Sequence, residues 1–108
     1  MTTTETALMR DILVAVNRLP DGLFWRVNVG IAATPDGRKM RYGLRGQADI
    51  AGVLNGRHVE IEVKTATGRQ SVQQRRWQSA VERAGGVYLV ARSVDEAVSA
   101  LDALEGFP

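Results

Sequence analysis

The chain has 108 residues, of which 44% are hydrophobic and 24% are charged, so we expect one ordinary globular domain over residues 1–108. Fourteen basic residues against twelve acidic ones give a net charge of +2, which is a weak indication of a nucleic-acid partner. The absence of cysteine excludes disulfides and thiolate metal sites, and a single histidine excludes a histidine-rich zinc centre. No apolar run has the length of a membrane span and the polar N-terminus does not look like a signal peptide, so we expect a cytoplasmic protein without a membrane partner.

The first half of the chain contains signals for one helix and one strand. Apolar residues at helical spacing predict a helix over residues 4–19, with Thr2, Thr3 or Thr4 as its cap. Alternation predicts a strand over residues 23–32, which the turn Thr34–Gly37 ends. We expect the basic segment that follows, up to residue 46, to be a loop or an irregular strand.

The second half is more strongly patterned. We expect a hairpin, a helix closed by two glycines, a short buried strand and a last helix capped by Ser93, at residues 48–64, 71–84, 87–91 and from 94 onward. The predicted order is therefore αβββαβα, an α/β protein with a mixed sheet flanked by helices.

The hairpin sets two carboxylates side by side. Asn55-Gly56 is a strong signal for a two-residue type I′ turn. A two-residue loop pairs Leu54 with Arg57, and continuing outward it places Asp49 opposite Glu62. A four-residue loop keeps this register, whereas a three-residue loop or a bulge would shift it.

Like charges opposed on one sheet face destabilise the sheet unless something neutralises them. The pair can share a proton, bind a cationic side chain or hold a divalent cation. Lys64 shares the face of Glu62 and lies beside the pair. The plainer alternative is a solvated strand face with a weak ion pair. In either case, we expect both Asp49 and Glu62 to be half-exposed.

Two polar residues occupy positions where the pattern predicts apolar ones. Glu5 lies on the buried line of the first helix, so its carboxylate either joins the site or completes a capping box. Gln74 faces inward near the start of the second predicted helix. Its amide either contacts the carboxylates, a water or a phosphate, or bonds to the preceding loop as a boundary residue.

Basic residues cluster before and after the hairpin. Such clusters attract phosphates, although a solvated surface is the default interpretation. The candidate DNA-binding residues are Lys39, Arg41, Arg45, Arg69, Arg75 and Arg76.

Taken in order, these motifs resemble the PD-(D/E)xK nuclease superfamily and are most similar to its VRR-NUC family. The resemblance is carried by helical Glu5, Gly46-x-x-Asp49, Glu62-x-Lys64 and Ser71-x-x-Gln74, and it extends to the strand after Gly86. One departure is Ala48, which stands where the superfamily's name has a proline. The resemblance implies a restriction-endonuclease-like αβββαβ core, to which the last helix would be an addition.

The resemblance also implies an Mg²⁺- or Mn²⁺-dependent endonuclease that hydrolyses DNA phosphodiester bonds. Asp49, Glu62 and the Val63 carbonyl would bind the metal, and Lys64 would act on the attacking water or on the developing phosphate charge. Glu5, through a water, and Gln74 would be supporting catalytic residues that order metal-bound water or the phosphate. No nucleotide cofactor is implied.

Stand-alone members of the family are similar to junction resolvases that act as homodimers. The implied substrate is branched DNA, above all four-way (Holliday) junctions, in DNA repair or in a phage or prophage. Two alternatives stay open, namely a catalytically silent nuclease-fold DNA-binding protein and a small basic interaction domain with a solvated charged face.

Overall fold

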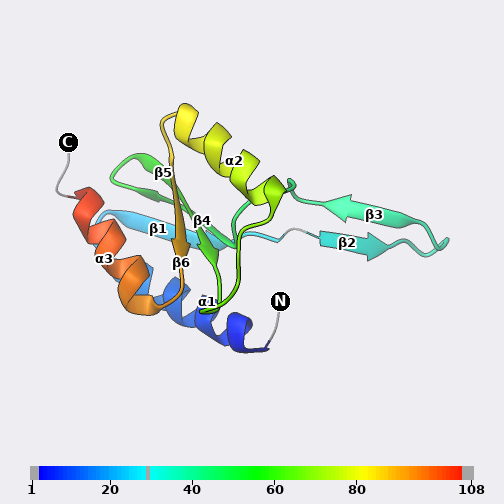
Figure 1. Cartoon of the computed structure of the whole chain (residues 1–108), viewed down its shortest axis with the longest axis horizontal. Coiled ribbons are helices and arrows are strands. Elements are labelled where there is room, and N and C mark those ends of the chain that lie inside the picture. Colours follow the sequence, from blue (N-terminus) through cyan, green and yellow to red (C-terminus); the bar gives the residue numbers. More distant parts are fainter. Residues whose placement is uncertain (1–2, 29, 106–108) are drawn as a thin grey trace.

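A computed structural model describes residues 3–28 and 30–105, which form an α/β protein with three helices, a mixed four-stranded sheet and a separate β-hairpin (Figure 1). The helices are α1 (Thr3–Val16), α2 (Val72–Arg83) and α3 (Val94–Glu105). The strands are β1 (Gly22–Arg26), β2 (Gly30–Ala33), β3 (Lys39–Tyr42), β4 (Ile50–Leu54), β5 (Arg57–Val63) and β6 (Val87–Ala91).

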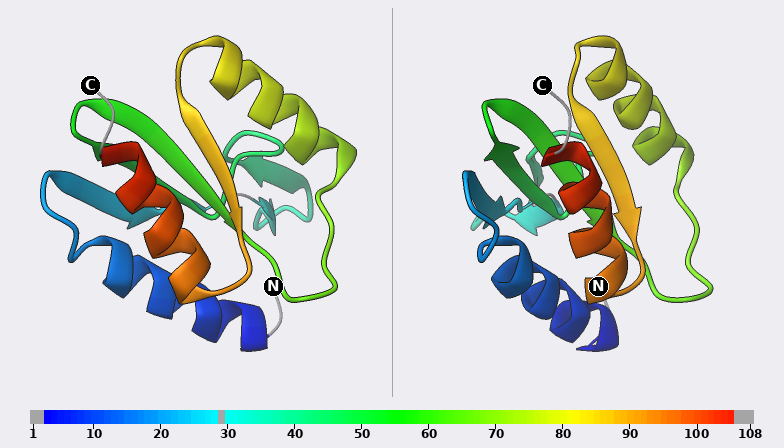
Figure 2. Two further views of the ribbon diagram at one scale, coloured as in Figure 1. Left: turned by 60° about the vertical axis from the view of Figure 1, so that its left-hand side comes forward. Right: turned by 90° about the vertical axis from the view of Figure 1, so that its left-hand side faces the viewer.

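The main sheet has the strand order β1-β4-β5-β6. β4 runs antiparallel to both β1 and β5, whereas β6 runs parallel to β5. The parallel connection passes through α2, which covers one face of the sheet, while α1 and α3 pack together on the other (Figure 2). β2 and β3 pair only with each other among the described strands.

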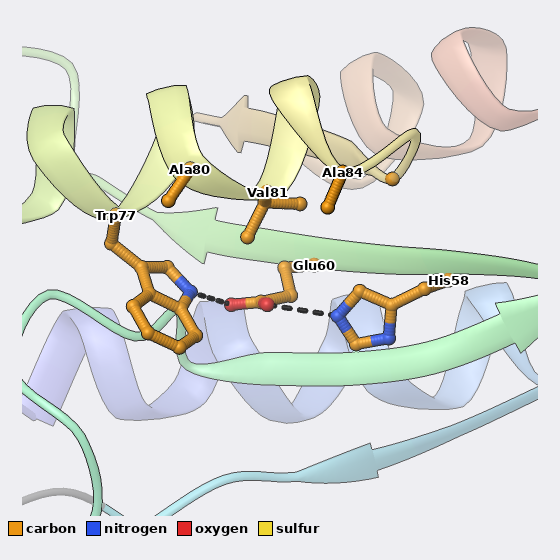
Figure 3. A pocket seen from close by; sticks show the side chains of 7 residues that line it. His58, Glu60, Trp77, Ala80, Val81 and Ala84 are labelled. Carbon is orange, nitrogen blue, oxygen red and sulfur yellow. Dashed lines mark hydrogen bonds and ion pairs between the residues drawn. The ribbon is translucent and has the colours of Figure 1, made fainter.

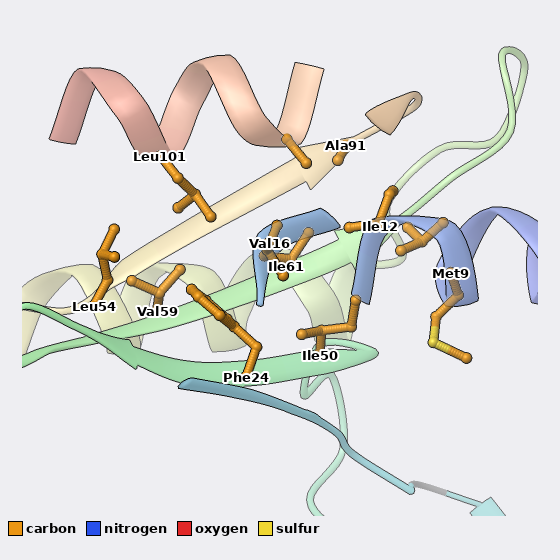
Figure 4. Packing of buried hydrophobic residues seen from close by; sticks show 12 residues of the cluster. Met9, Ile12, Val16, Phe24, Ile50, Leu54, Val59, Ile61, Ala91 and Leu101 are labelled. Carbon is orange, nitrogen blue, oxygen red and sulfur yellow. The ribbon is translucent and has the colours of Figure 1, made fainter. Parts of the chain in front are cut away.

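The larger core lies between the sheet and the two helices α1 and α3 (Figure 4). Ile50 and Ile61 are opposed across β4 and β5 and are fully buried, as is Ile12 of α1. Because successive strand residues point to opposite faces, burying Ile61 on this side directs Glu60 and Glu62 toward α2. The core therefore fixes which face carries the carboxylates.

The β4–β5 hairpin confirms the predicted turn and register. Asn55 and Gly56 both have positive φ, at 51° and 81°, as a type I′ turn requires. Leu54 pairs with Arg57, and the same register runs on to Ile50 opposite Ile61. One more step along the strands brings Asp49 beside Glu62, as predicted.

The predicted first helix ends three residues early, at Val16. Asn17 leaves the helix and uses its side chain on β1, donating to the Phe24 carbonyl at 3.1 Å and accepting from the Phe24 N–H at 2.8 Å. These bonds cover the free edge of the sheet, which explains why a polar residue follows the helix. The predicted cap Thr2 lies outside the described residues.

The single strand predicted over residues 23–32 is wrong. The chain forms β1 up to Arg26 and then β2 from Gly30, in two different sheets. β4 begins at Ile50, so β1 has no partner strand beyond that point. The basic segment predicted as a loop or irregular strand contains β3, which pairs with β2.

The elements after the hairpin confirm the predictions closely. Ser71 caps α2 and Gly85, with φ 92°, follows its last turn. Ser93 accepts from the Glu96 N–H at 3.1 Å, as an N-terminal cap of α3 does. No helix within the described ranges has both the length and the apolar character needed to cross a bilayer.

Candidate metal and nucleic-acid site

Asp49 is held at the junction of three strands. Its main-chain oxygen accepts from the Val27 N–H at 2.8 Å, and its Oδ2 accepts from the Val63 N–H at 2.9 Å. These bonds fix both the backbone and the carboxylate relative to β1 and β5. The side chain is half-buried, so one part of the carboxylate remains accessible.

Glu62 is only 4% exposed, which contradicts the expectation that it is half-exposed. The physical reason is α2, which packs on this face together with Tyr88 of β6. Burial, followed by the charge of Asp49 and a hydrogen bond with it, raises the pKa of Glu62 to about 8, and Lys64 opposes this only in part. Without a metal ion, the raised pKa therefore favours the protonated form of Glu62.

Tyr88 and Lys64 contact the two oxygens of Glu62. The Tyr88 hydroxyl donates to Oε2 across a long 3.5 Å, and burial raises the pKa of this tyrosine above its ordinary value. The Lys64 ammonium lies 3.8 Å from Oε1, and its side chain is 18% exposed. The prediction that Lys64 lies beside the carboxylate pair is confirmed.

Glu60 is a buried carboxylate that the sequence analysis did not single out. It is 1% exposed and accepts from the Trp77 indole N–H at 2.7 Å (Figure 3). It also accepts from the Ala48 N–H at 3.2 Å. Its other oxygen lies 2.8 Å from Nε2 of His58. The alternation of β5 predicts that Glu60 lies on the face opposite Ile61, but it does not predict that Glu60 is buried. Glu60 is buried because the apolar side of α2 packs on this face of the sheet.

The bond between Glu60 and Ala48 gives a structural role to the residue that precedes Asp49. Ala48 is 1% exposed and donates its N–H to this carboxylate. A proline has no N–H and would leave one oxygen of Glu60 without that donor. The N–H of Ala48, the residue before Asp49, therefore links the chain at this point to Glu60 of β5.

Gly46 has a structural role at the start of the same motif. Its φ is 82°, and a Cβ there would lie 2.2 Å from the main-chain oxygen of Gln73. Only glycine lets this loop approach the first turn of α2 so closely. The loop that leads to Asp49 is thus packed against the helix that carries Gln74.

Gln74 forms a capping box with Ser71. Its Oε1 accepts from the Ser71 N–H at 2.8 Å, and its own N–H donates to the Ser71 hydroxyl at 3.1 Å. This is the alternative in which Gln74 is a boundary residue bonded to the preceding loop. A direct contact with the carboxylates or a phosphate stays a prediction.

Glu5 is half-buried on α1, one turn before the fully buried Met9. Glu5 thus lies on the inner line of α1, a helix that contacts β5. Among the described residues, no three His, Asp or Glu side chains gather as a metal-binding group, so Glu5 does not complete a triad with the pair. Its contribution through a water stays a prediction.

A polar hollow of about 260 Å³ adjoins Asp49. It lies between the end of β1, the base of the β2–β3 hairpin and the loop before β4. Its lining consists of Arg26, Val27, Asn28, Tyr42, Gln47, Ala48 and Asp49. One member of the carboxylate pair is therefore open to a ligand, although the other is buried.

The predicted DNA-binding residues are all exposed, and they lie on β3, on α2 and in the loops before β4 and before α2. Lys39 and Arg41 lie on β3, while Arg69 lies in the loop before α2. Arg45 and Arg76 are far apart in sequence, but both line a surface pocket of about 250 Å³ that also contains Trp77. Arg75, on α2, donates to the Gln70 carbonyl at 3.2 Å.

Comparison with known proteins adds no assignment to this geometry. No protein-family model matches the chain. No curated protein matches it either. The chemistry of the site is consequently argued from its own residues.

Proposed function

We propose that the protein is a metal-dependent endonuclease of the VRR-NUC type, with a restriction-endonuclease-like core, that hydrolyses phosphodiester bonds in DNA. One observation carries the proposal. Glu62 is buried beside Asp49, and the Lys64 ammonium lies 3.8 Å from Oε1 of Glu62. Two adjacent carboxylates, one of them buried, repel each other unless a proton, a cationic side chain or a metal ion neutralises them. This arrangement favours a site of chemistry over a structural ion pair.

The donor set fits Mg²⁺ or Mn²⁺. Asp49, Glu62 and the Val63 carbonyl would hold the ion, because all three offer the oxygen ligands that hard divalent cations prefer. The polar hollow beside Asp49 gives room for waters and a phosphate. When bound, the ion would supply charge stabilisation at a phosphate oxygen and would lower the pKa of a bound water.

The chain's own side chains would do the rest. Lys64 would orient the attacking water or stabilise negative charge as it develops on the phosphate. Glu60 would hold Ala48, and through it the loop before Asp49, in place. Gln74 would order the start of α2, and Glu5 would order a water at the site.

The proposed substrate is branched DNA, with four-way junctions as the leading form. The domain is small and has little room for a module that reads bases, so recognition of DNA shape through its backbone is favoured. A homodimer would present two such sites for symmetric cuts. The role proposed with this substrate is DNA repair, in a host, phage or prophage.

The alternative with a specific observation behind it is a catalytically silent DNA-binding protein. The exposed basic residues around Trp77 would serve it equally well. It gives no reason, however, for Asp49, Glu62 and Lys64 to be held together. The interaction-domain alternative needs a solvated charged face, and the burial of Glu60 and Glu62 contradicts that.

Calorimetric titration with Mn²⁺ tests the proposal. The unmodified protein should bind the ion, and Asp49→Ala should lose most of that affinity because a direct ligand is removed. Arg18→Ala, at an exposed position at the other end of the sheet, is the control. Absence of Mn²⁺ binding would favour the catalytically silent DNA-binding protein. If Mn²⁺ binds, incubation with labelled linear, flapped and four-way DNA, with Mg²⁺ or EDTA, would identify the substrate form.

A further inference from the structure

The β2–β3 hairpin projects from the body of the protein as an arm, defined here as residues 30–45 (Figure 1). The molecule measures 51 × 30 × 24 Å, and the arm extends along the longest of these dimensions. Every residue of β3 is exposed. A two-stranded hairpin is only marginally stable by itself, so a surface displayed in this way is well suited to a partner.

The strand register divides the arm into two faces, because directly paired residues share a face. Ile31 pairs with Arg41 and Ala33 with Lys39, so one face carries two cations. The opposite face pairs Gly30 with Tyr42 and Ala32 with Met40, and it carries no charge. We call the first of these the basic face.

The cations of the basic face have no partner within the described part of the chain. Arg38, near the tip, is paired with Asp36 at 3.2 Å. Neither Lys39 nor Arg41 takes part in an ion pair among the described residues. Their charges are therefore available to an anionic ligand.

Positive charge is concentrated on the arm. Residues 30–45 contain four basic side chains and one acidic side chain, which is a net charge of +3. The whole chain carries only +2, so the remainder is slightly negative. Charge complementarity thus favours a polyanion at the arm, because the body of a second copy of this chain, with a net charge of only −1, offers far less negative charge.

The arm is rooted beside the carboxylate pair. It departs after Val27, which donates to the main-chain oxygen of Asp49, and it returns through the loop that leads to Asp49. From Gly30 to Thr34, where the turn begins, the arm extends over roughly 13 Å at about 3.3 Å per residue. That length corresponds to about four base pairs of duplex at about 3.4 Å each.

We propose that the basic face of the arm, Lys39 and Arg41, binds the phosphate backbone of a DNA duplex several base pairs from the carboxylate pair. This inference rests on the proposed function, and it deepens it by separating the element that grips the duplex from the one that cuts. Each cation neutralises a phosphate and releases a condensed counterion. The contact positions the duplex and reads no sequence.

The test is DNA binding in EDTA, where no cleavage occurs, measured over a range of salt concentrations on a labelled four-way junction and a linear duplex. Lys39→Ala/Arg41→Ala should weaken binding about tenfold or more and reduce the slope of log K against log salt by about 1.8 for two lost phosphate contacts. Arg10→Ala/Arg18→Ala removes the same charge from exposed positions on and just after α1 and should change the slope little. Met40→Ala, on the uncharged face of β3, should leave DNA binding unchanged.

An unchanged slope in the arm double variant would overturn the proposal, as would a loss of the same size in the α1 control. A change in oligomeric state by light scattering with unaltered DNA affinity would also overturn it and identify the arm as an interface between copies. The failure of the proposed function looks different. In that case Mg²⁺ would produce no cleavage while arm-dependent binding in EDTA persisted.

Discussion

Glu60 and Glu62 lie two residues apart on β5 and have different chemical environments. The oxygens of Glu60 bond to Trp77, Ala48 and His58, all within 3.2 Å. Those of Glu62 have a long contact with Tyr88, the ammonium of Lys64 at 3.8 Å and the second carboxylate, Asp49. A carboxylate with saturated bonds supports the structure, whereas one with spare acceptor capacity beside a second carboxylate is free to bind a ligand.

The pKa of Glu62 predicts a pH dependence of stability in the metal-free protein. The folded pKa of about 8 exceeds the ordinary value of 4.5, so the folded state binds more protons than the unfolded state between these values. The free energy of unfolding should therefore fall as pH rises through this window, by up to about 1.4 kcal/mol per pH unit from this group. Urea denaturation in EDTA at pH 5.5 and pH 8 measures it.

Glu62→Gln is the matched variant, because the amide stays neutral at both pH values. Its loss of stability between pH 5.5 and pH 8 should be smaller than that of the unmodified protein. Equal pH dependence in the two proteins would contradict the raised pKa.

Lys64 should separate metal binding from chemistry. It contributes no oxygen ligand and carries positive charge, so Lys64→Ala should retain or slightly improve Mn²⁺ affinity. The same change should lower single-turnover cleavage about 10²-fold or more, the range typical of losing a positioned acid–base or electrostatic group. A rate within about threefold of the unmodified protein, under about 1 kcal/mol, would reduce Lys64 to a counterion.

At the level of elements, the β4–β5 hairpin and α2 could be predicted from sequence because their signals are local. Asn55-Gly56 determines the turn, and Ser71 with Gln74 determines the start of the helix. The break between β1 and β2 could not be predicted, because the alternation of apolar and polar residues continues past Arg26. The strand ends there because its partner, β4, begins at Ile50, opposite Arg26. The paired carboxylates followed from register, whereas the burial of Glu62 depends on tertiary packing by α2.

Asn17 protects the edge of the sheet at β1. Both main-chain groups of Phe24 bond to its side chain, so they are closed to strand pairing with another chain. Asn17→Ala should lower the free energy of unfolding by about 1–2 kcal/mol and increase self-association. Arg18→Ala is the adjacent control, and urea denaturation with size-exclusion chromatography measures both effects.

An Asn17→Ala protein that matches the Arg18→Ala control in stability and elution volume would contradict this role. Self-association with unchanged stability would show that the side chain guards the edge without stabilising the fold.

At the scale of the whole molecule, the two proposed functional parts meet at one end of the sheet. The carboxylate pair lies where β4 begins and β5 ends, and the basic arm leaves from the same place (Figure 1). The polar hollow between them is lined by residues of both, including Tyr42 from the arm and Asp49 from the pair. The carboxylate pair and the base of the arm therefore border one hollow.

Cleavage of a labelled four-way junction tests the central claim, that the Asp49–Glu62 pair supports metal-dependent hydrolysis of DNA. With Mg²⁺ the unmodified protein should cleave the junction, and EDTA should abolish the reaction. Asp49→Asn and Glu62→Gln, which keep the shape of each side chain, should each lower the single-turnover rate by at least about 10³-fold while junction binding in EDTA persists. Cleavage that survives EDTA, or a rate in either variant within about threefold of the unmodified protein, would contradict the account.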